Sequence, residues 1–284
     1  LGTVYAALGT KVTVVEMTPG LLPGADRDLV KVLQKRLASR MAAILLQTTV
    51  KSLKVQKNGI KAILEGPDVE QNARIFDKVL LAVGRRPNSA GLGLANTSIE
   101  VDGRGFITVD AQRRTAEKHI FAIGDVAGEP MLAHKASHEG RVAAEVIAGR
   151  QVVYEPAAIP AVVFTDPEIA WVGLTEKEAA DRSIAHKVVR FPWAASGRAA
   201  TLDRDDGLTK LVIDPQSERI IGMGIVGSGA GEMISEGVLA IEMGANVTDV
   251  GLTIHPHPTL TETIMEAADL FHGTATHFYQ SKRK

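Results

Sequence analysis

The 284-residue sequence contains no cysteine. A disulfide, a catalytic thiolate or a cysteine metal site therefore cannot come from this chain. Its 45% apolar residues are ordinary for a globular protein with a sizeable core. The length is sufficient for two domains, or for parts of three.

The sequence also lacks an excess of charge and any long apolar run. Its 32 basic and 33 acidic residues nearly cancel, which argues against nucleic acid as the main partner. The one run of like charge, residues 282–284, is interpreted as a solvated tail. No apolar run is long enough to cross a bilayer, and no signal-peptide pattern opens the chain. We expect no membrane partner and a cytoplasmic location.

The first residues have the pattern of a dinucleotide-binding unit. A short helix over Leu1–Leu8 precedes a strand over Lys11–Val15, and the strand ends at Glu16. In such a βαβ unit a glycine loop precedes the helix, and an acid about 20 residues further on binds the ribose hydroxyls. Because the loop is missing and the chain begins with Leu1, we interpret the sequence as a fragment. A solvated strand end is the alternative for Glu16.

A helix and several strands are expected next, up to a composition change at residues 84–88. The helix covers Asp28–Leu37, and strands are expected at Ala43–Leu46, Val50–Val55, Ile60–Leu64 and Val79–Val83. Lys57-Asn58-Gly59 is typical of a hairpin turn. Arg85 and Arg86, in the segment after Val83, suit either a phosphate or a solvated turn.

A glycine and an aspartate end the next apolar segment. Strands are expected at Phe106–Val109 and Ile120–Asp125, followed by a helix over Met131–Ala148. Gly124 allows a ligand to approach the backbone, and the Asp125 carboxylate can accept hydrogen bonds from hydroxyls. A helix N-terminus favours negative charge. A tight turn with a purely structural role is the alternative.

After Pro156 short alternating strands indicate an antiparallel sheet flanked by helices, an α+β domain. Strands are expected at Val162–Phe164, Ala170–Val172, Lys187–Val189, Thr209–Ile213 and Ile220–Val226, and helices at Thr175–Asp181, Ala230–Met243 and Thr261–Leu270.

Two histidines and a glutamate lie in the proline-bounded stretch Ile254–Glu262. Proline restricts the backbone, so His257 and Glu262 are held in defined directions. The alternative is structural, because Thr259-x-x-Glu262 is also a capping box at a helix start. We expect His255 to be structural.

Six motifs in order resemble the pyridine nucleotide-disulfide oxidoreductases, in particular the branch that oxidises dihydrolipoamide. They are Val83-Gly84-Arg85-Arg86-Pro87-Asn88, His119 to Asp125, Met131 to Ala136, Ile159-Pro160 with Thr165-Asp166-Pro167-Glu168, Val172-Gly173, and His255-Pro256-His257-Pro258-Thr259. The resemblance implies an α/β plus α+β fold: the C-terminal part of a Rossmann-like NAD domain (1–85), the second segment of an FAD domain (86–155) and an interface domain (156–284).

The resemblance also implies roles for single residues. His257 would be the acid/base of dithiol oxidation and Glu262 would orient it. Asp125 would bind the ribityl chain of FAD, and the segment Met131, Leu132 and Ala133 would lie at the flavin pyrimidine. Glu16 would bind the NAD ribose, and Gly84 would lie against the nicotinamide half. No metal is expected.

The resemblance further implies a homodimer that serves a lipoyl-bearing acyltransferase or carrier protein of a 2-oxo acid dehydrogenase complex. Family members carry an FAD glycine motif, a redox cysteine pair and an NAD glycine loop before this region, and none is in this chain. Two alternatives remain open: another flavin disulfide reductase of the glutathione-reductase type, and an inactive dimerisation fragment.

Overall fold

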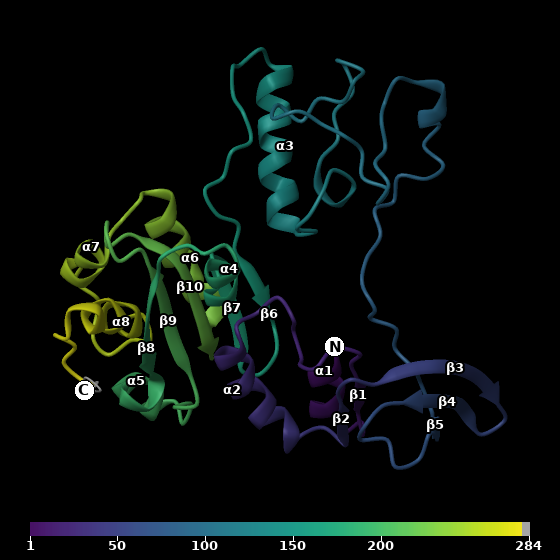
Figure 1. Ribbon diagram of the computed structural model, residues 1–284, viewed down its shortest axis with the longest axis horizontal. Helices are drawn as coiled ribbons and strands as arrows, with labels where there is room; N and C mark the ends of the chain where they lie inside the picture. Colours follow the sequence, from purple (N-terminus) through teal and green to yellow (C-terminus); the bar gives the residue numbers. More distant parts are fainter. Residues whose placement is uncertain (280–284) are drawn as a thin grey trace. The chain divides into compact units, whose positions relative to one another are not determined.

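A computed structural model describes residues 1–279, and its chain divides into two compact units (Figure 1). One unit combines Leu1–Val79 with Pro160–Lys284, and the other is Leu80–Ile159. The middle unit is close in extent to the predicted FAD segment, 86–155. The first and last predicted domains, 1–85 and 156–284, fall largely into one unit.

The N-terminal segment forms the helix, strand and helix that its pattern predicts. Helix α1 (Gly2–Ala7) precedes strand β1 (Thr13–Val15), which pairs in parallel with β2 (Ala43–Leu45). Between the strands lies α2 (Arg27–Ala38). Its apolar residues recur at helical spacing and bury one face, so the expected amphipathic helix is confirmed. The buried residues are Leu29, Val30, Leu33 and Leu37.

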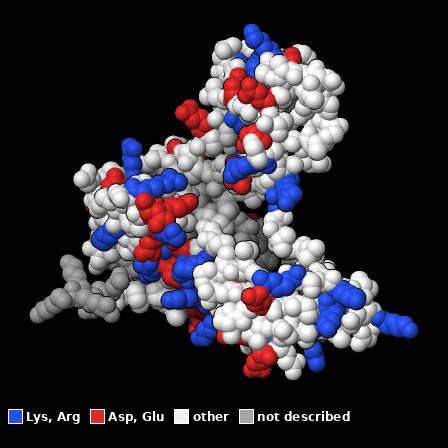
Figure 2. Space-filling model, turned by 45° about the vertical axis from the view of Figure 1, so that its right-hand side comes forward, with Lys and Arg blue, Asp and Glu red and all other residues white. Residues whose placement is uncertain are grey.

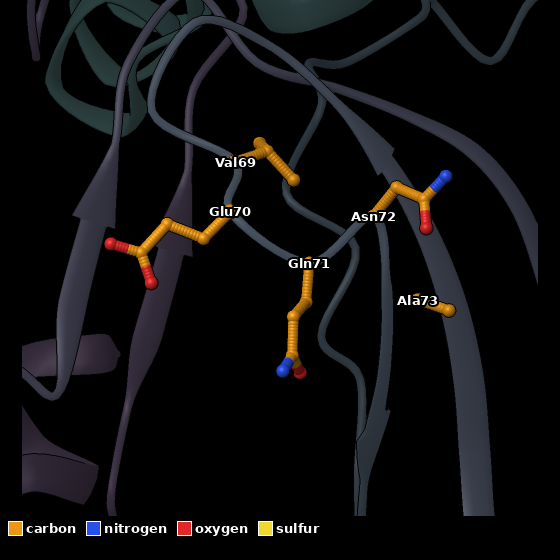
Figure 3. Close-up of a pocket in the computed structure, with 5 residues that line it drawn as sticks. All are labelled: Val69, Glu70, Gln71, Asn72 and Ala73. Atoms are coloured by element: carbon orange, nitrogen blue, oxygen red, sulfur yellow. The ribbon is translucent and has the colours of Figure 1, made fainter.

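Three strands form a separate antiparallel sheet after β2. Strands β3 (Thr49–Gln56) and β4 (Gly59–Glu65) form the predicted hairpin, and β5 (Ala73–Phe76), which was not predicted, pairs with β4. A surface hollow lies along residues 69–73, between β4 and β5, where the side chains point in different directions (Figure 3). The hollow does not gather polar groups around a common point.

The expected strand over Val79–Val83 is wrong. These residues have no strand assignment, and Leu81 and Val83 are 69% and 94% exposed. Their apolar side chains favour a strand, but a strand also needs a neighbour for its backbone hydrogen bonds. None of the strands described between residues 1 and 279 pairs with this segment.

A five-stranded antiparallel sheet is the centre of the 160–279 segment, as predicted. Its order is β6-β7-β10-β9-β8. The strands are β6 (Ala161–Val163), β7 (Glu168–Gly173), β8 (Lys187–Pro192), β9 (Leu208–Ile213) and β10 (Ile220–Gly227).

Helices cover both faces of this sheet. The predicted helices are α4 (Glu176–Asp181), α6 (Ala230–Glu242) and α8 (Glu262–His272), and the chain adds α5 (Gly197–Thr201) and α7 (Val247–Leu252). Met223 on β10 meets Gly237 of α6, whereas the next residue, Gly224, meets Leu29 of α2. Because neighbouring residues of a strand point to opposite faces, α6 and α2 lie on opposite sides of the sheet.

The middle unit contains one long helix, α3 (Ala133–Ile147), which confirms the helix predicted at 131–148. The strands expected at Phe106–Val109 and Ile120–Asp125 are wrong, since each contributes only an isolated bridge, Val101 with Ile107 and Arg114 with Phe121. Two short 3₁₀ turns, η1 (Leu94–Asn96) and η2 (Gly124–Val126), take up part of the remaining chain.

Basic and acidic side chains are interspersed on the face shown in Figure 2, in agreement with the balanced composition. Within the described residues, no helix is long and apolar enough to span a membrane.

Candidate active site and cofactor-binding segments

His257 and Glu262 form a directly hydrogen-bonded pair. Nδ1 of His257 lies 2.8 Å from Oε1 of Glu262. The histidine side chain is 71% exposed, whereas that of Glu262 is 18% exposed. A carboxylate can only accept, so Nδ1 carries the hydrogen and Nε2 is directed to solvent as a potential proton acceptor.

A backbone amide fixes the second oxygen of Glu262. The Thr259 amide donates to Oε2 of Glu262 at 2.7 Å. Burial by itself would raise the pKa of Glu262, but the hydrogen bonds from Thr259 and His257, with the charges of His257 and His277, hold this pKa below its usual range. Glu262 is therefore ionised at neutral pH.

The Thr259-x-x-Glu262 capping box is only half formed. The glutamate half is present, but the Thr259 hydroxyl donates to the Pro256 carbonyl at 2.7 Å. The N-cap of α8 is Thr261, which makes no side-chain cap hydrogen bond. Because the helix starts at Glu262 itself, the Thr259 hydroxyl is not in register with the amide that a capping box would use.

His255 is held by two groups outside this pair. Its Nδ1 lies 2.8 Å from the Thr253 carbonyl oxygen, and its Nε2 lies 2.8 Å from Oε1 of Glu236 on α6. Its side chain is 5% exposed. Both ring nitrogens are therefore occupied, unlike those of His257.

In the middle unit, Asp125 lies in the η2 turn with its side chain 51% exposed. The fully buried carboxylate of Glu139 holds this turn, because Oε2 accepts the Gly124 amide at 2.6 Å. Arg113 and Lys135 neutralise Glu139 at 2.9 and 3.0 Å. Gly124 has φ of 72°, a left-handed conformation that favours glycine.

The segment before α3 is suited to an anionic group. No side chain caps the N-terminus at Leu132, and the first turn, from Ala133, contains no acid. The amides there leave partial positive charge. Arg85 donates to the Met131 carbonyl at 2.8 Å and lies 3.9 Å from Asp125. This arginine therefore links Asp125 to Met131, and these residues fit the negatively charged, hydroxyl-bearing group expected of a flavin nucleotide.

Glu16 and Gly84 lie in different units. Glu16 follows β1, and its Oε1 accepts the Thr18 amide at 2.7 Å. Gly84 has φ of 122°, and a Cβ placed on it would have no neighbour within 4 Å. This backbone favours glycine and leaves space for a ligand to approach, but the predicted NAD-binding roles of both residues stay predictions.

The sequence reasoning overlooked several residues that support these sites: Arg85 as a link, Glu139 as a buried anchor and Glu236 as the partner of His255. Of these, only Glu139 could have been identified from the sequence, because Lys135 lies four residues before it on the predicted helix and this spacing favours an ion pair. Among the described residues, no group of three or more histidine or acidic side chains is arranged to hold a metal.

Two family models match consecutive parts of the chain. Residues 1–140 match the pyridine nucleotide-disulphide oxidoreductase model, and residues 159–268 match the dimerisation domain of the same family. The chain belongs to the pyridine nucleotide-disulphide oxidoreductases. A dinucleotide-binding region and a dimerisation domain are thereby identified within the mixed α/β fold.

Oxidoreductases of this family that resemble the chain include the dihydrolipoyl dehydrogenases of Vibrio cholerae and Haemophilus influenzae. The first is 49% identical over 284 residues, 100% of this chain and 60% of the relative. The second is 46% identical over 100% of this chain and 59% of the relative. The chain therefore spans about 60% of the length of these relatives.

Two solved structures are also similar to the chain. LpdA from Mycobacterium tuberculosis matches with a TM-score of 0.87 and 28% identity over 95% of this chain and 58% of that chain. The HOCl-induced flavoprotein disulfide reductase RclA from Escherichia coli matches with a TM-score of 0.85 and 26% identity, over 95% of this chain and 61% of that chain.

Proposed function

We propose that the complete protein containing this chain is a dihydrolipoyl dehydrogenase. It oxidises protein-bound dihydrolipoamide and passes the electrons through a redox disulfide and FAD to NAD. The observation that carries this proposal is the His257–Glu262 hydrogen bond of 2.8 Å, in a chain 49% identical to a dihydrolipoyl dehydrogenase.

His257 has the geometry of a base for the substrate thiol. With ordinary pKa values near 8.5 for a thiol and 6.5 for a histidine, proton transfer costs about 2.7 kcal/mol. An ionised carboxylate beside the imidazole stabilises the imidazolium that forms and lowers this cost. Glu262 also keeps the hydrogen on Nδ1, so that Nε2 receives the thiol proton.

FAD would supply the two-electron transfer between dithiol and NAD. Asp125 would bind its ribityl hydroxyls, and the α3 N-terminus, at Met131, Leu132 and Ala133, would stabilise negative charge on the flavin. Glu16 would bind the NAD ribose, disfavouring a 2′-phosphate. The fit of the FAD site rests on the exposed carboxylate, the uncapped helix and the buried Glu139 support.

The dimerisation-domain match supports a homodimer in which His257 serves the redox disulfide of the partner subunit. The substrate would be the lipoyl group of an acyltransferase or carrier protein of a 2-oxo acid dehydrogenase complex. A chain without cysteine needs the disulfide from elsewhere in the complete protein.

Two other functions are favoured by specific observations. The likeness to RclA, a flavoprotein disulfide reductase, supports the alternative of another flavin disulfide reductase. Production of NADH from dihydrolipoamide, compared with NADPH oxidation by disulfides, separates these two activities. NADPH oxidation alone would reject the proposal.

The lack of cysteine instead supports an inactive dimerisation fragment. Intact mass and the visible spectrum of the natural protein test this possibility. The proposal requires flavin absorption and a mass of about 50 kDa, because the 30.2 kDa chain corresponds to 60% of the relative. A 30.2 kDa product without flavin would support the fragment.

A further inference from the structure

A buried ion-pair cluster contacts the backbone next to the proposed FAD-binding residues of the middle unit. Its members are Lys135, Glu139 and Arg113, whose side chains are 4%, 0% and 13% exposed. Nζ of Lys135 and Nη1 of Arg113 lie 3.0 and 2.9 Å from the same oxygen, Oε1 of Glu139. Two cations therefore share one anion, and the three side chains together carry an excess of one positive charge.

The ammonium group of Lys135 also contacts the loop that contains Asp125. Nζ lies 3.1 Å from the Gly128 carbonyl oxygen and 3.4 Å from that of Gly124. Gly124 directly precedes Asp125, the residue proposed to bind the ribityl hydroxyls. The Gly124 amide is held from the other side by Oε2 of Glu139, at 2.6 Å. The positive charge of Lys135 is thereby fixed at this loop.

Lys135 belongs at the same time to the first turn of α3. The helix begins at Ala133, so Lys135 is its third residue. With a rise of about 1.5 Å per residue, the two backbone positions lie about 3 Å apart along the helix axis. The uncapped amides of this turn carry partial positive charge. Lys135 therefore adds charge of the same sign at the segment proposed to lie at the flavin pyrimidine.

Burial strengthens the effect of this excess charge on a neighbouring group. Two charges inside a protein interact several times more strongly than the same charges in water. Exposed charges, in contrast, are largely screened by salt. Buried charge is also costly unless an opposite charge meets it. The cluster therefore favours a ligand that becomes more negative at this end of α3.

We propose that Lys135 tunes the bound flavin, because the excess positive charge of its cluster raises the midpoint potential of the flavin. Oxidation of a dithiol releases two electrons and two protons. Both electrons and one proton enter the flavin, and the other proton leaves through His257. The reduced flavin then carries a negative charge on its pyrimidine ring at neutral pH, and positive charge nearby stabilises this form over the oxidised one. The inference rests on the FAD-binding part of the proposed function.

Lys135→Met in the complete flavoprotein removes the charge and keeps an unbranched side chain. The midpoint potential of the flavin, measured from its visible absorbance in equilibrium with a reference dye, is expected to fall. The expected change is about tenfold in the ratio of reduced to oxidised flavin, or about 30 mV for a two-electron couple. Lys135→Arg keeps the charge and should restore the potential. Arg141→Met, which removes an 80% exposed cation from the same helix, should leave it unchanged.

Glu139→Gln is expected to shift the potential in the opposite direction. Glutamine keeps an oxygen for the Gly124 amide but removes the anion, so the excess of positive charge increases. The midpoint potential should therefore rise. A purely structural role of the cluster predicts no such reversal, since both substitutions disturb the same ion pairs. The sign of this shift decides the inference even where Lys135→Met does not fold.

Unchanged potentials in Lys135→Met and Glu139→Gln, or shifts of the same sign, would overturn the inference. For a variant that binds FAD weakly, FAD is added in excess and the absorbance of free flavin is subtracted. Failure of the proposed function is distinct, because it shows in the wild type itself as a complete protein without flavin absorption.

Discussion

Nδ1 of His257 lies 2.8 Å from a carboxylate oxygen of Glu262, whose other oxygen accepts the Thr259 amide. The glutamate is mostly buried and the imidazole is mostly exposed. One end of the pair is therefore fixed by the protein while the other is open to a substrate, an arrangement suited to moving a proton.

His257→Gln in the complete protein is expected to slow dithiol oxidation by about 10² to 10⁴-fold, because it removes the proton acceptor. FAD should stay bound. Rapid-mixing measurement of flavin reduction by dihydrolipoamide reads this step directly. His186→Gln, at a partly exposed histidine outside the site, is the control. Wild-type rates in His257→Gln would contradict the assignment.

Glu139→Ala is expected to weaken FAD binding by about 10- to 100-fold, since it removes the charged acceptor that holds the Gly124 amide beside Asp125. It also leaves Arg113 and Lys135 without their buried partner. Flavin retention during dialysis measures the effect. Glu145→Ala, on the same helix with surface ion pairs, should retain flavin normally.

Lys210→Met is expected to destabilise the protein by about 3–5 kcal/mol, because it removes a buried cation shared by three carboxylates. It leaves Asp26 without a charged partner among the described residues, while Asp28 and Glu176 keep Arg190. Nζ of Lys210 is 2.8 Å from Asp26 and Glu176 and 3.0 Å from Asp28, and its side chain is 1% exposed. Denaturant unfolding gives the change in free energy.

The exposed pair of Lys177 with Asp181 provides the control for this prediction. Lys177→Met should change the unfolding free energy by less than about 1 kcal/mol. An equal effect of the two substitutions would show that burial of Lys210 does not decide its contribution.

The pKa of Asp28 indicates how the cluster of Lys210 with Asp26, Asp28 and Glu176 responds to acid. Burial alone would raise the pKa of Asp28. The hydrogen bonds and charges of Arg190 and Lys210 outweigh this effect, so the pKa of Asp28 lies below its usual value. A lowered folded-state pKa contributes stability above the unfolded value, near 3.9, that is lost as pH falls through the folded value. The stability difference between wild type and Asp28→Asn should therefore shrink below about pH 4. A difference that grows on acidification would reverse this sign.

Gly207→Ala is expected to cost about 1–3 kcal/mol by overpacking. A Cβ at Gly207 would lie 2.2 Å from Cδ2 of Trp193, a fully buried ring. Gly197→Ala is the matched control, since its Cβ would meet nothing within 4 Å. Thermal unfolding of both variants checks the prediction, and equal midpoints would contradict it.

Local patterns in the sequence were sufficient for the elements with regular spacing. Helix α2 and the antiparallel strands follow from apolar periodicity, and the His257–Glu262 pair spans five residues at a helix start. Such features depend on neighbours along the chain, so residue order determines them.

Contacts between distant segments were decided by the tertiary structure. Glu236 meets His255 across 19 residues, and Lys210 meets Asp28 across 182. The capping box of Thr259 and Glu262 is only half formed, because helix α8 begins at Glu262. The apolar run Val79–Val83 has strand composition but no paired neighbour among the described strands.

The sequence by itself therefore determined the regularly spaced helices and the antiparallel strands after residue 160, the family resemblance and the candidate dyad, because each depends on residue type and spacing. Only the tertiary structure decided which buried charges are paired, how the His257 loop is anchored and which apolar runs become strands. These outcomes depend on hydrogen-bond partners that are supplied by remote parts of the chain.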